Sequence, residues 1–158
     1  MEPEKRCYEI RLADDPERRG PGILEGVLMP YETRAADRPE LFARDSLRWP
    51  EGGIILNEMH NRRAPITRFT PEVRDNALRV SIPLPDTQRG RDAALSVRNG
   101  TLRGFSVEFH CDRETRQAGV RVIEAARLVA AGLVDDPSYS QASVSVRAKK
   151  RGGRRVWL

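Results

Sequence analysis

The sequence predicts a mostly β fold, an antiparallel and barrel-like arrangement of short strands with short helical additions. Three observations favour this class. Apolar and polar residues alternate cleanly along 78–84, which is typical of a strand with one buried face. Residues 105–111 carry aromatic and aliphatic side chains on one strand face and polar side chains on the other. Clear helical spacing is confined to 91–99, so many strands accompany one central helix.

The expected elements follow one another along the chain. Strands are expected at 8–12, 23–29, 54–56, 78–84, 105–111 and 120–123, with further apolar segments at 127–134 and 144–146. We interpret 40–47 as a helical turn and the polar stretch up to Gly119 as a loop. The helix should turn three apolar side chains inward, those of Ala94, Leu95 and Val97. Gly100 stands where a C-cap glycine is expected.

The length of 158 residues suits one domain, which we place at 1–146, followed by a basic tail at 147–158. The tail carries six of the arginines and lysines, whereas the net charge of the whole chain is +5. The rest of the chain is therefore close to neutral, and we interpret the tail as a solvated or docking extension. It lacks apolar periodicity up to residue 156, so it should be mobile unless a partner orders it.

Composition argues against several classes of protein. No apolar run approaches the ~20 residues of a membrane span, and no apolar stretch typical of a secretory signal follows the first residues. Cys7 and Cys111 are far apart, give no disulfide framework and favour a reducing compartment. The glycines and histidines form neither a phosphate-binding loop nor a ligand set, so we expect no cofactor and no metal.

Two residues suggest a base and a nucleophile. Ser106 lies on the polar face of its strand, and His60 ends an apolar run. An imidazole that takes the hydroxyl proton turns a serine into a nucleophile. His110 and Cys111 cannot form such a pair with each other, because adjacent strand residues point to opposite faces, and Cys111 is expected to be a small core residue.

Four collinear blocks of sequence carry a resemblance to a known family. They are 26–31 with 39–42, Met59-His60 with Pro65-Ile66, 93–109, and 133–139. Within the third block, the run Arg103-Gly104-Phe105-Ser106-Val107 is the most specific. Over 22–146 the chain resembles the prohead (head-maturation) proteases of tailed bacteriophages, serine peptidases that are distantly similar to the herpesvirus assemblins.

The resemblance implies a function for the two residues and a setting for the chain. Ser106 would attack the peptide carbonyl, His60 would shuttle the proton, and backbone amides would stabilise the oxyanion. The substrates would be scaffold or delta segments of the major capsid protein, and the chain itself, inside the assembling procapsid in the host cytoplasm. The implied fold is a β-barrel wrapped by helices, with no cofactor and no membrane, and a homo-oligomer stays open.

The sequence leaves the third catalytic residue, the acceptor that orients the histidine, open. Relatives often carry a glutamate in the strand before the proline-containing motif, but this chain has Ala130 at that position. Glu124 is the first substitute, because a hairpin of 105–111 with 120–124 would place it nearly opposite Ser106. Glu108 is the second, since it shares a strand face with Ser106. A simple His–Ser dyad with a backbone or water acceptor is the remaining alternative.

Two other functions stay open on the sequence alone. The first is a catalytically inactive virion or assembly protein with the protease fold, which Ala130 favours. The second is a small basic nucleic-acid-binding module. Four Phe and two Trp argue against specific nucleic-acid binding, because single-strand binders rely on stacking aromatic side chains. For the tail, an acidic scaffold surface is the expected partner rather than DNA.

Overall fold

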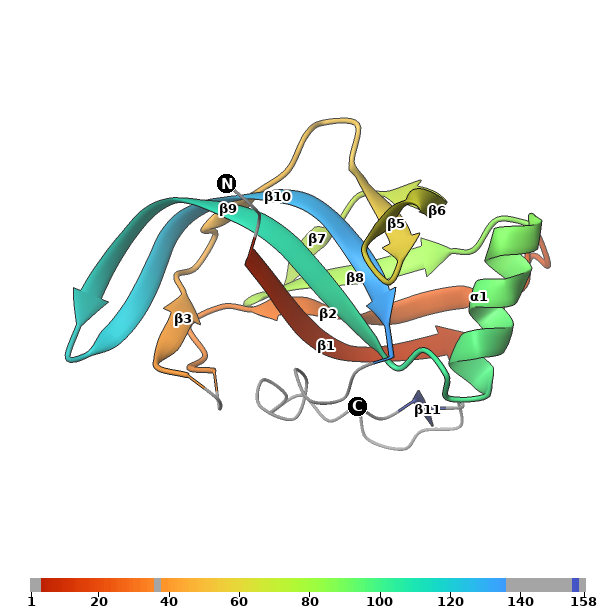
Figure 1. Cartoon of the computed structure of the whole chain (residues 1–158), viewed down its shortest axis with the longest axis horizontal. Coiled ribbons are helices and arrows are strands. Elements are labelled where there is room, and N and C mark those ends of the chain that lie inside the picture. The colour runs from red at the N-terminus through yellow and green to blue at the C-terminus, as the bar shows by residue number, and fades with distance from the viewer. Residues whose placement is uncertain (1–3, 36–37, 136–154, 157–158) are drawn as a thin grey trace.

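The protein is described by a computed structural model in which residues 4–35, 38–135 and 155–156 are placed (Figure 1). Its strands are β1 (Glu4–Ala13), β2 (Ile23–Pro30), β3 (Glu40–Phe42), β4 (Leu47–Arg48), β5 (Ile54–Glu58), β6 (Asn61–Phe69), β7 (Glu72–Arg74), β8 (Ala77–Pro83), β9 (Gly104–Gln117), β10 (Val120–Val134) and β11 (Arg155–Val156). Within the described residues there is one helix, α1 (Gln88–Arg98). The prediction of a mostly β fold with short helices is confirmed.

The strands form one open, strongly curved sheet. They are ordered β6-β5-β10-β9-β1-β2-β8-β7. The end strands β6 and β7 do not pair with each other, so the expected barrel is not closed. The sheet is also not purely antiparallel, because β10 pairs in parallel with β3, β4 and β5 in succession. β10 has fifteen residues, which is long enough to serve three short strands on one edge and β9 on the other.

The β9–β10 hairpin is longer than the sequence pattern predicts. The polar stretch that we interpreted as a loop continues β9 to Gln117, and Ala118 and Gly119 make the turn with φ of 51° and 79°. Two consecutive residues with positive φ are typical of a type I′ hairpin. The arm is polar because it extends beyond the core (Figure 1), and its strands are tied by ion pairs such as Arg113–Glu124. The helical turn expected at 40–47 is also wrong, because β3 and β4 pair there with β10.

The core lies on one face of β9 and against helix α1. The side chains of Phe105, Val107 and Phe109 have no exposed area, and the Phe109 ring meets Phe42 edge to face at 5.1 Å between centroids. These aromatic contacts add to the apolar area that the strand removes from water.

Helix α1 is held at both ends by caps. Thr87 accepts a hydrogen bond from the Gly90 amide at 3.1 Å, and the backbone turns at Gly100 with φ of 82°. Ala94 and Val97 are fully buried as expected, whereas Leu95 is 60% exposed. The prediction for Leu95 is wrong because the buried face repeats at three- and four-residue intervals from Gly90, and Leu95 lies off this stripe.

The predicted boundary between a domain at 1–146 and a tail at 147–158 stays an interpretation. Most of the tail, and the strand expected at 144–146, lie outside the described residues. The described part of the tail is β11, whose Val156 and Arg155 are paired with Ile10 and Arg11 of β1.

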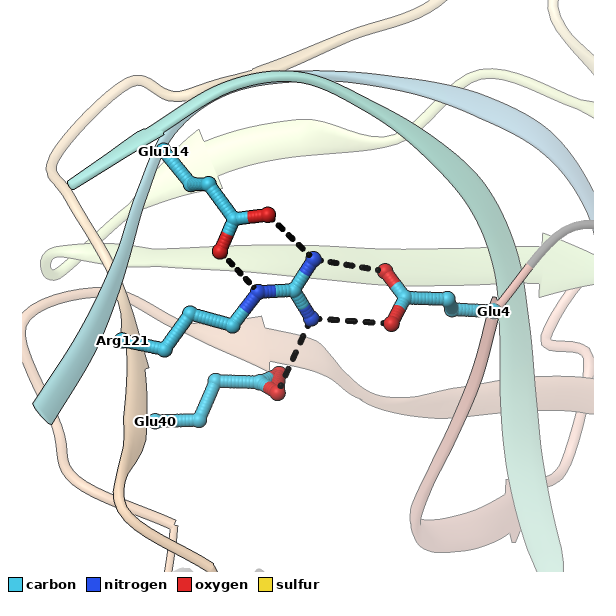
Figure 2. Close-up of polar contacts among 4 residues, drawn as sticks. All are labelled: Glu4, Glu40, Glu114 and Arg121. Carbon is cyan, nitrogen blue, oxygen red and sulfur yellow. Dashed lines mark hydrogen bonds and ion pairs between the residues drawn. The ribbon is translucent and has the colours of Figure 1, made fainter. Parts of the chain in front are cut away.

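A four-residue ion cluster ties four strands together at one end of the sheet (Figure 2). Arg121 of β10 donates to both carboxylate oxygens of Glu4 at 2.8 and 3.1 Å, and to both oxygens of Glu114 at 2.5 and 3.2 Å. Its Nη1 also lies 3.5 Å from Glu40, which is only 4% exposed. The hydrogen bonds that Arg121 donates to Glu4 and Glu114 raise the pKa of Arg121, and the hydrogen bond from Arg121 lowers the pKa of Glu114.

We expect Arg121→Gln to lower the free energy of unfolding at pH 7 by roughly 3 kcal/mol, because it leaves three carboxylates together without a cation, and one of them, Glu40, is buried. Without the cation these carboxylates repel one another, and the pKa of Glu114, which Arg121 lowers in the unsubstituted protein, rises in the folded variant. Folded protein then binds more protons than unfolded protein, and the deficit relative to the unsubstituted protein should shrink as the pH falls from 7 to ~4.5. Urea unfolding at several pH values measures this.

Arg127→Gln is the matched control, since Arg127 also makes two short contacts to a carboxylate, Asp112, but its side chain is 60% exposed. It should destabilise the fold far less than Arg121→Gln does, because solvent screens an exposed ion pair. Equal losses for the two variants would show that the Arg121 cluster is an ordinary surface ion pair.

Candidate active site

His60 occupies a strained hairpin turn. Glu58 of β5 pairs with Asn61 of β6, so Met59 and His60 form the whole connection, with φ of 51° and 58°. The Met59 amide donates to the Leu133 carbonyl of β10 at 2.8 Å and holds the turn against the sheet. A residue other than glycine costs about 1 kcal/mol or more of conformational free energy in this left-handed region of backbone angles. A methionine and a histidine therefore stand where turn propensity favours asparagine and glycine.

Gly132 of β10 makes the space that the imidazole of His60 occupies. A Cβ atom at Gly132 would lie 3.0 Å from Nδ1 and 3.1 Å from Cε1 of His60. The ring can lie directly on the strand only because this residue has no side chain. Sequence reasoning missed Gly132, although a glycine inside an apolar strand is a known sign of close approach by another group.

Ser106 lies next to this imidazole across the β9–β10 ladder. Its backbone partner is Gly132, and directly paired residues of an antiparallel ladder project to the same face. Cβ positions of such a pair are about 5 Å apart, so the ring that covers Gly132 is within a side chain's length of Ser106. Ser106 is only 5% exposed, although it lies on the face of the strand that the sequence pattern predicts to be polar.

Glu108 contacts His60 directly. Its Oε1 lies 2.5 Å from Nδ1, although Nδ1 does not donate an aligned hydrogen bond to it. Glu108 is 4% exposed and lies two residues beyond Ser106, on the same face of β9. Its partner across the ladder is Ala130, next to a register shift in β10. A carboxylate from β9 thus faces the position at which the resemblance implies a glutamate on β10.

Glu124, the first substitute expected for the third member, lies elsewhere. The hairpin turns at 118–119, so Ile123 pairs with Glu114 and the partner of Ser106 is Gly132. Glu124 instead accepts hydrogen bonds from Arg113 at 2.9 Å and Thr115 at 3.2 Å, in the polar arm. The expected register is wrong because it assumed that 112–119 was a loop, which shortened β9.

Asn57 extends the same row of residues by one strand. It pairs with Gly132 from the other side, in β5, and is 2% exposed. Its Oδ1 is buried and accepts no hydrogen bond from the described residues. Six polar or charged residues are buried in the described part of the chain, and three of them, Asn57, Ser106 and Glu108, lie in this region. Their gathering on one sheet face makes it the candidate functional site, because burying polar groups is costly.

Other chemistry is poorly supported. Cys111 is a partly buried free thiol, and burial raises its pKa, which disfavours the thiolate. Across the described residues, His, Cys, Asp and Glu side chains form no group of three that would suit a metal ion. None of the helical segments placed in the structure is both long and apolar enough to cross a membrane.

Comparison with families of known proteins finds a match. A family model described as caudovirus prohead serine protease matches residues 57–153, more than half of the chain. No curated protein and no solved structure matches. The matched region begins at Asn57 and contains His60, Ser106, Glu108 and Gly132. The chain belongs to the caudovirus prohead serine protease family.

Proposed function

We propose that this chain is a serine endopeptidase of procapsid maturation, with Ser106 as nucleophile, His60 as general base and Glu108 as the carboxylate that orients the imidazole. One observation carries the proposal. His60 lies over Gly132, the ladder partner of Ser106, while its Nδ1 is 2.5 Å from Glu108. Contact of Nδ1 with a carboxylate leaves Nε2 for the serine hydroxyl, as a base in this chemistry requires.

The reaction follows from these roles. The Oγ of Ser106 forms a bond to the scissile carbonyl carbon as its proton passes to Nε2 of His60. The C–N bond then breaks and the proton goes to the leaving amine, which leaves an ester on Ser106. Water, deprotonated by the same imidazole, hydrolyses this ester. Glu108 stabilises the imidazolium in both steps, and its contact with Nδ1 would become linear once substrate is bound.

Family membership supports capsid components as substrates. We propose that the enzyme cleaves scaffold or delta segments of the major capsid protein, and itself, inside the procapsid in the host cytoplasm.

Glu108 argues against the alternative of a catalytically inactive relative. Ala130 favours that alternative on sequence alone, but Glu108 is its ladder partner and brings a buried carboxylate to the same place.

We expect a fluorophosphonate probe to label Ser106, which mass spectrometry of the labelled peptide would locate. Ser106→Ala should abolish labelling, and both His60→Ala and Glu108→Gln should slow it, the latter by roughly 10- to 1,000-fold because the imidazolium loses its carboxylate. The same order should hold for cleavage of the major capsid protein on co-expression.

Glu124→Gln is the control, since it removes a carboxylate that accepts a hydrogen bond from Arg113 in the polar arm of the same hairpin. It should react at the unsubstituted rate. Labelling at another serine, or a slow Glu124→Gln beside a fast Glu108→Gln, would contradict the assigned roles.

Gly132→Ala should reduce the labelling rate by roughly 10- to 100-fold, because the new methyl group pushes the imidazole away from Ser106. The free energy of unfolding should fall by roughly 1–3 kcal/mol, since the added methyl group meets the ring and the backbone nitrogen of His60 at 3.0–3.2 Å in a buried part of the sheet.

Gly52→Ala serves as its control, because a Cβ there meets nothing within 4 Å. It should leave the rate unchanged. If Gly132→Ala reacts at full rate while remaining folded, the ring does not need its place over β10 and the dyad geometry is wrong.

A further inference from the structure

A bulged segment with two arginines follows His60. Along the β5–β6 ladder, Asn57 pairs with Pro65 and the next residue, Glu58, pairs with Asn61. Residues 62–64 therefore stand out from the ladder. Arg62 and Arg63 in this segment are exposed. Bulges of this kind are common next to active sites, where they redirect side chains.

The backbone of this segment is held in place. The Arg63 amide donates to Oδ1 of Asn61 at 2.9 Å, which closes a local turn. The Arg63 carbonyl accepts a hydrogen bond at 3.2 Å from the guanidinium of Arg89, in helix α1. The helix lies at the same end of the molecule as the β5–β6 hairpin (Figure 1). Arg89 thus fixes the bulge and brings a third positive charge to it.

These charges are not neutralised within the described part of the chain. Many arginines there contact a carboxylate, as Arg121 and Arg127 do, whereas neither Arg62 nor Arg63 makes an ion pair. Nearby acidic groups have other contacts, since Asp86 accepts from Arg91 and Asp92 accepts from Gln88. Glu58, on the other side of the turn, is the remaining carboxylate of the hairpin. The patch of Arg62, Arg63 and Arg89 is therefore net positive.

We propose that Arg62, Arg63 and Arg89 form a carboxylate-binding subsite, which selects cleavage sites with an acidic side chain a few residues from the scissile bond. The proposal rests on the proposed function, because it takes the peptide to be bound beside His60. An extended peptide substrate advances about 3.3 Å per residue. Arg62 and Arg63, two and three residues after His60, therefore reach substrate side chains that lie a few residues from the scissile bond. Guanidinium groups bind carboxylates through two parallel hydrogen bonds, which gives selectivity for position as well as charge.

The experiment compares peptides that differ at one side chain. An equimolar library of fluorescein-labelled peptides carries Asp, Asn or Lys at each position around a fixed cleavable core taken from the capsid protein. Cleavage by the unsubstituted enzyme is followed by mass spectrometry, and binding to the Ser106→Ala variant is followed by fluorescence anisotropy. We expect roughly a fivefold preference for Asp over Asn at one or two positions, which corresponds to about 1 kcal/mol, the upper value for an exposed ion pair. High salt should reduce this preference.

Charge reversal provides the decisive variant. Arg62→Glu combined with Arg63→Glu should turn the preference from Asp to Lys, and the two single changes identify the residue that makes the contact. The control, Arg34→Glu combined with Arg116→Glu, changes the net charge equally. Arg34 and Arg116 are exposed near β3 and at the β9–β10 turn, far from α1 in the fold. The control should keep the preference for Asp.

The outcomes separate the subsite from the enzyme. If the fluorophosphonate probe never labels Ser106 but the Ser106→Ala variant still prefers Asp peptides, the proposed function fails and the subsite stands. If labelling and cleavage occur with no preference for Asp, or with one that charge reversal leaves unchanged, the subsite is overturned. Preferential binding of a single-stranded oligonucleotide over every Asp peptide would also overturn it. Arg62→Gln with Arg63→Gln repeats the test if the reversed variant does not fold.

Discussion

The antiparallel ladder between β9 and β10 is the constraint on which the rest of the structure depends. It supplies the long edge of β10 that three short strands use in parallel, and it supplies the core face of β9. The same ladder also fixes the site, because its register brings Ser106 opposite Gly132 and Glu108 opposite Ala130. A shift of the β9–β10 register by one residue would turn Ser106 and Glu108 to the core face. The site and the core face of β9 would then be lost together.

The site combines strain, space and burial in a small area. His60 lies in a left-handed turn, over a glycine that leaves room for its ring, and against a carboxylate that is almost fully buried. Each feature alone has a cost in free energy, from backbone strain to desolvation of Glu108. Together they hold the imidazole in one place, which is what a general base needs before substrate arrives.

Charge is distributed differently at the two ends of the sheet. At one end, Arg121 is surrounded by three carboxylates and holds β1, β3, β9 and β10 together. At the other end, Arg62 and Arg63 stand beside His60 with no carboxylate partner in the described part of the chain. The first arrangement satisfies its charges internally and stabilises the fold. The second leaves positive charge for a ligand, and so bears on recognition rather than on stability.

The sequence alone determined the fold class, the main strands and the two residues proposed as base and nucleophile. Alternation along 78–84 reports which face of that strand is buried. The block around Ser106 carries the family resemblance, although both faces of β9 are buried there. It could not determine the partner of His60. That choice depends on the register of β9 with β10, which is set by where a distant hairpin turns. The tertiary structure therefore decided for Glu108 over Glu124 as the neighbour of His60, and it alone revealed Gly132, because contacts between strands leave no periodic trace within either one.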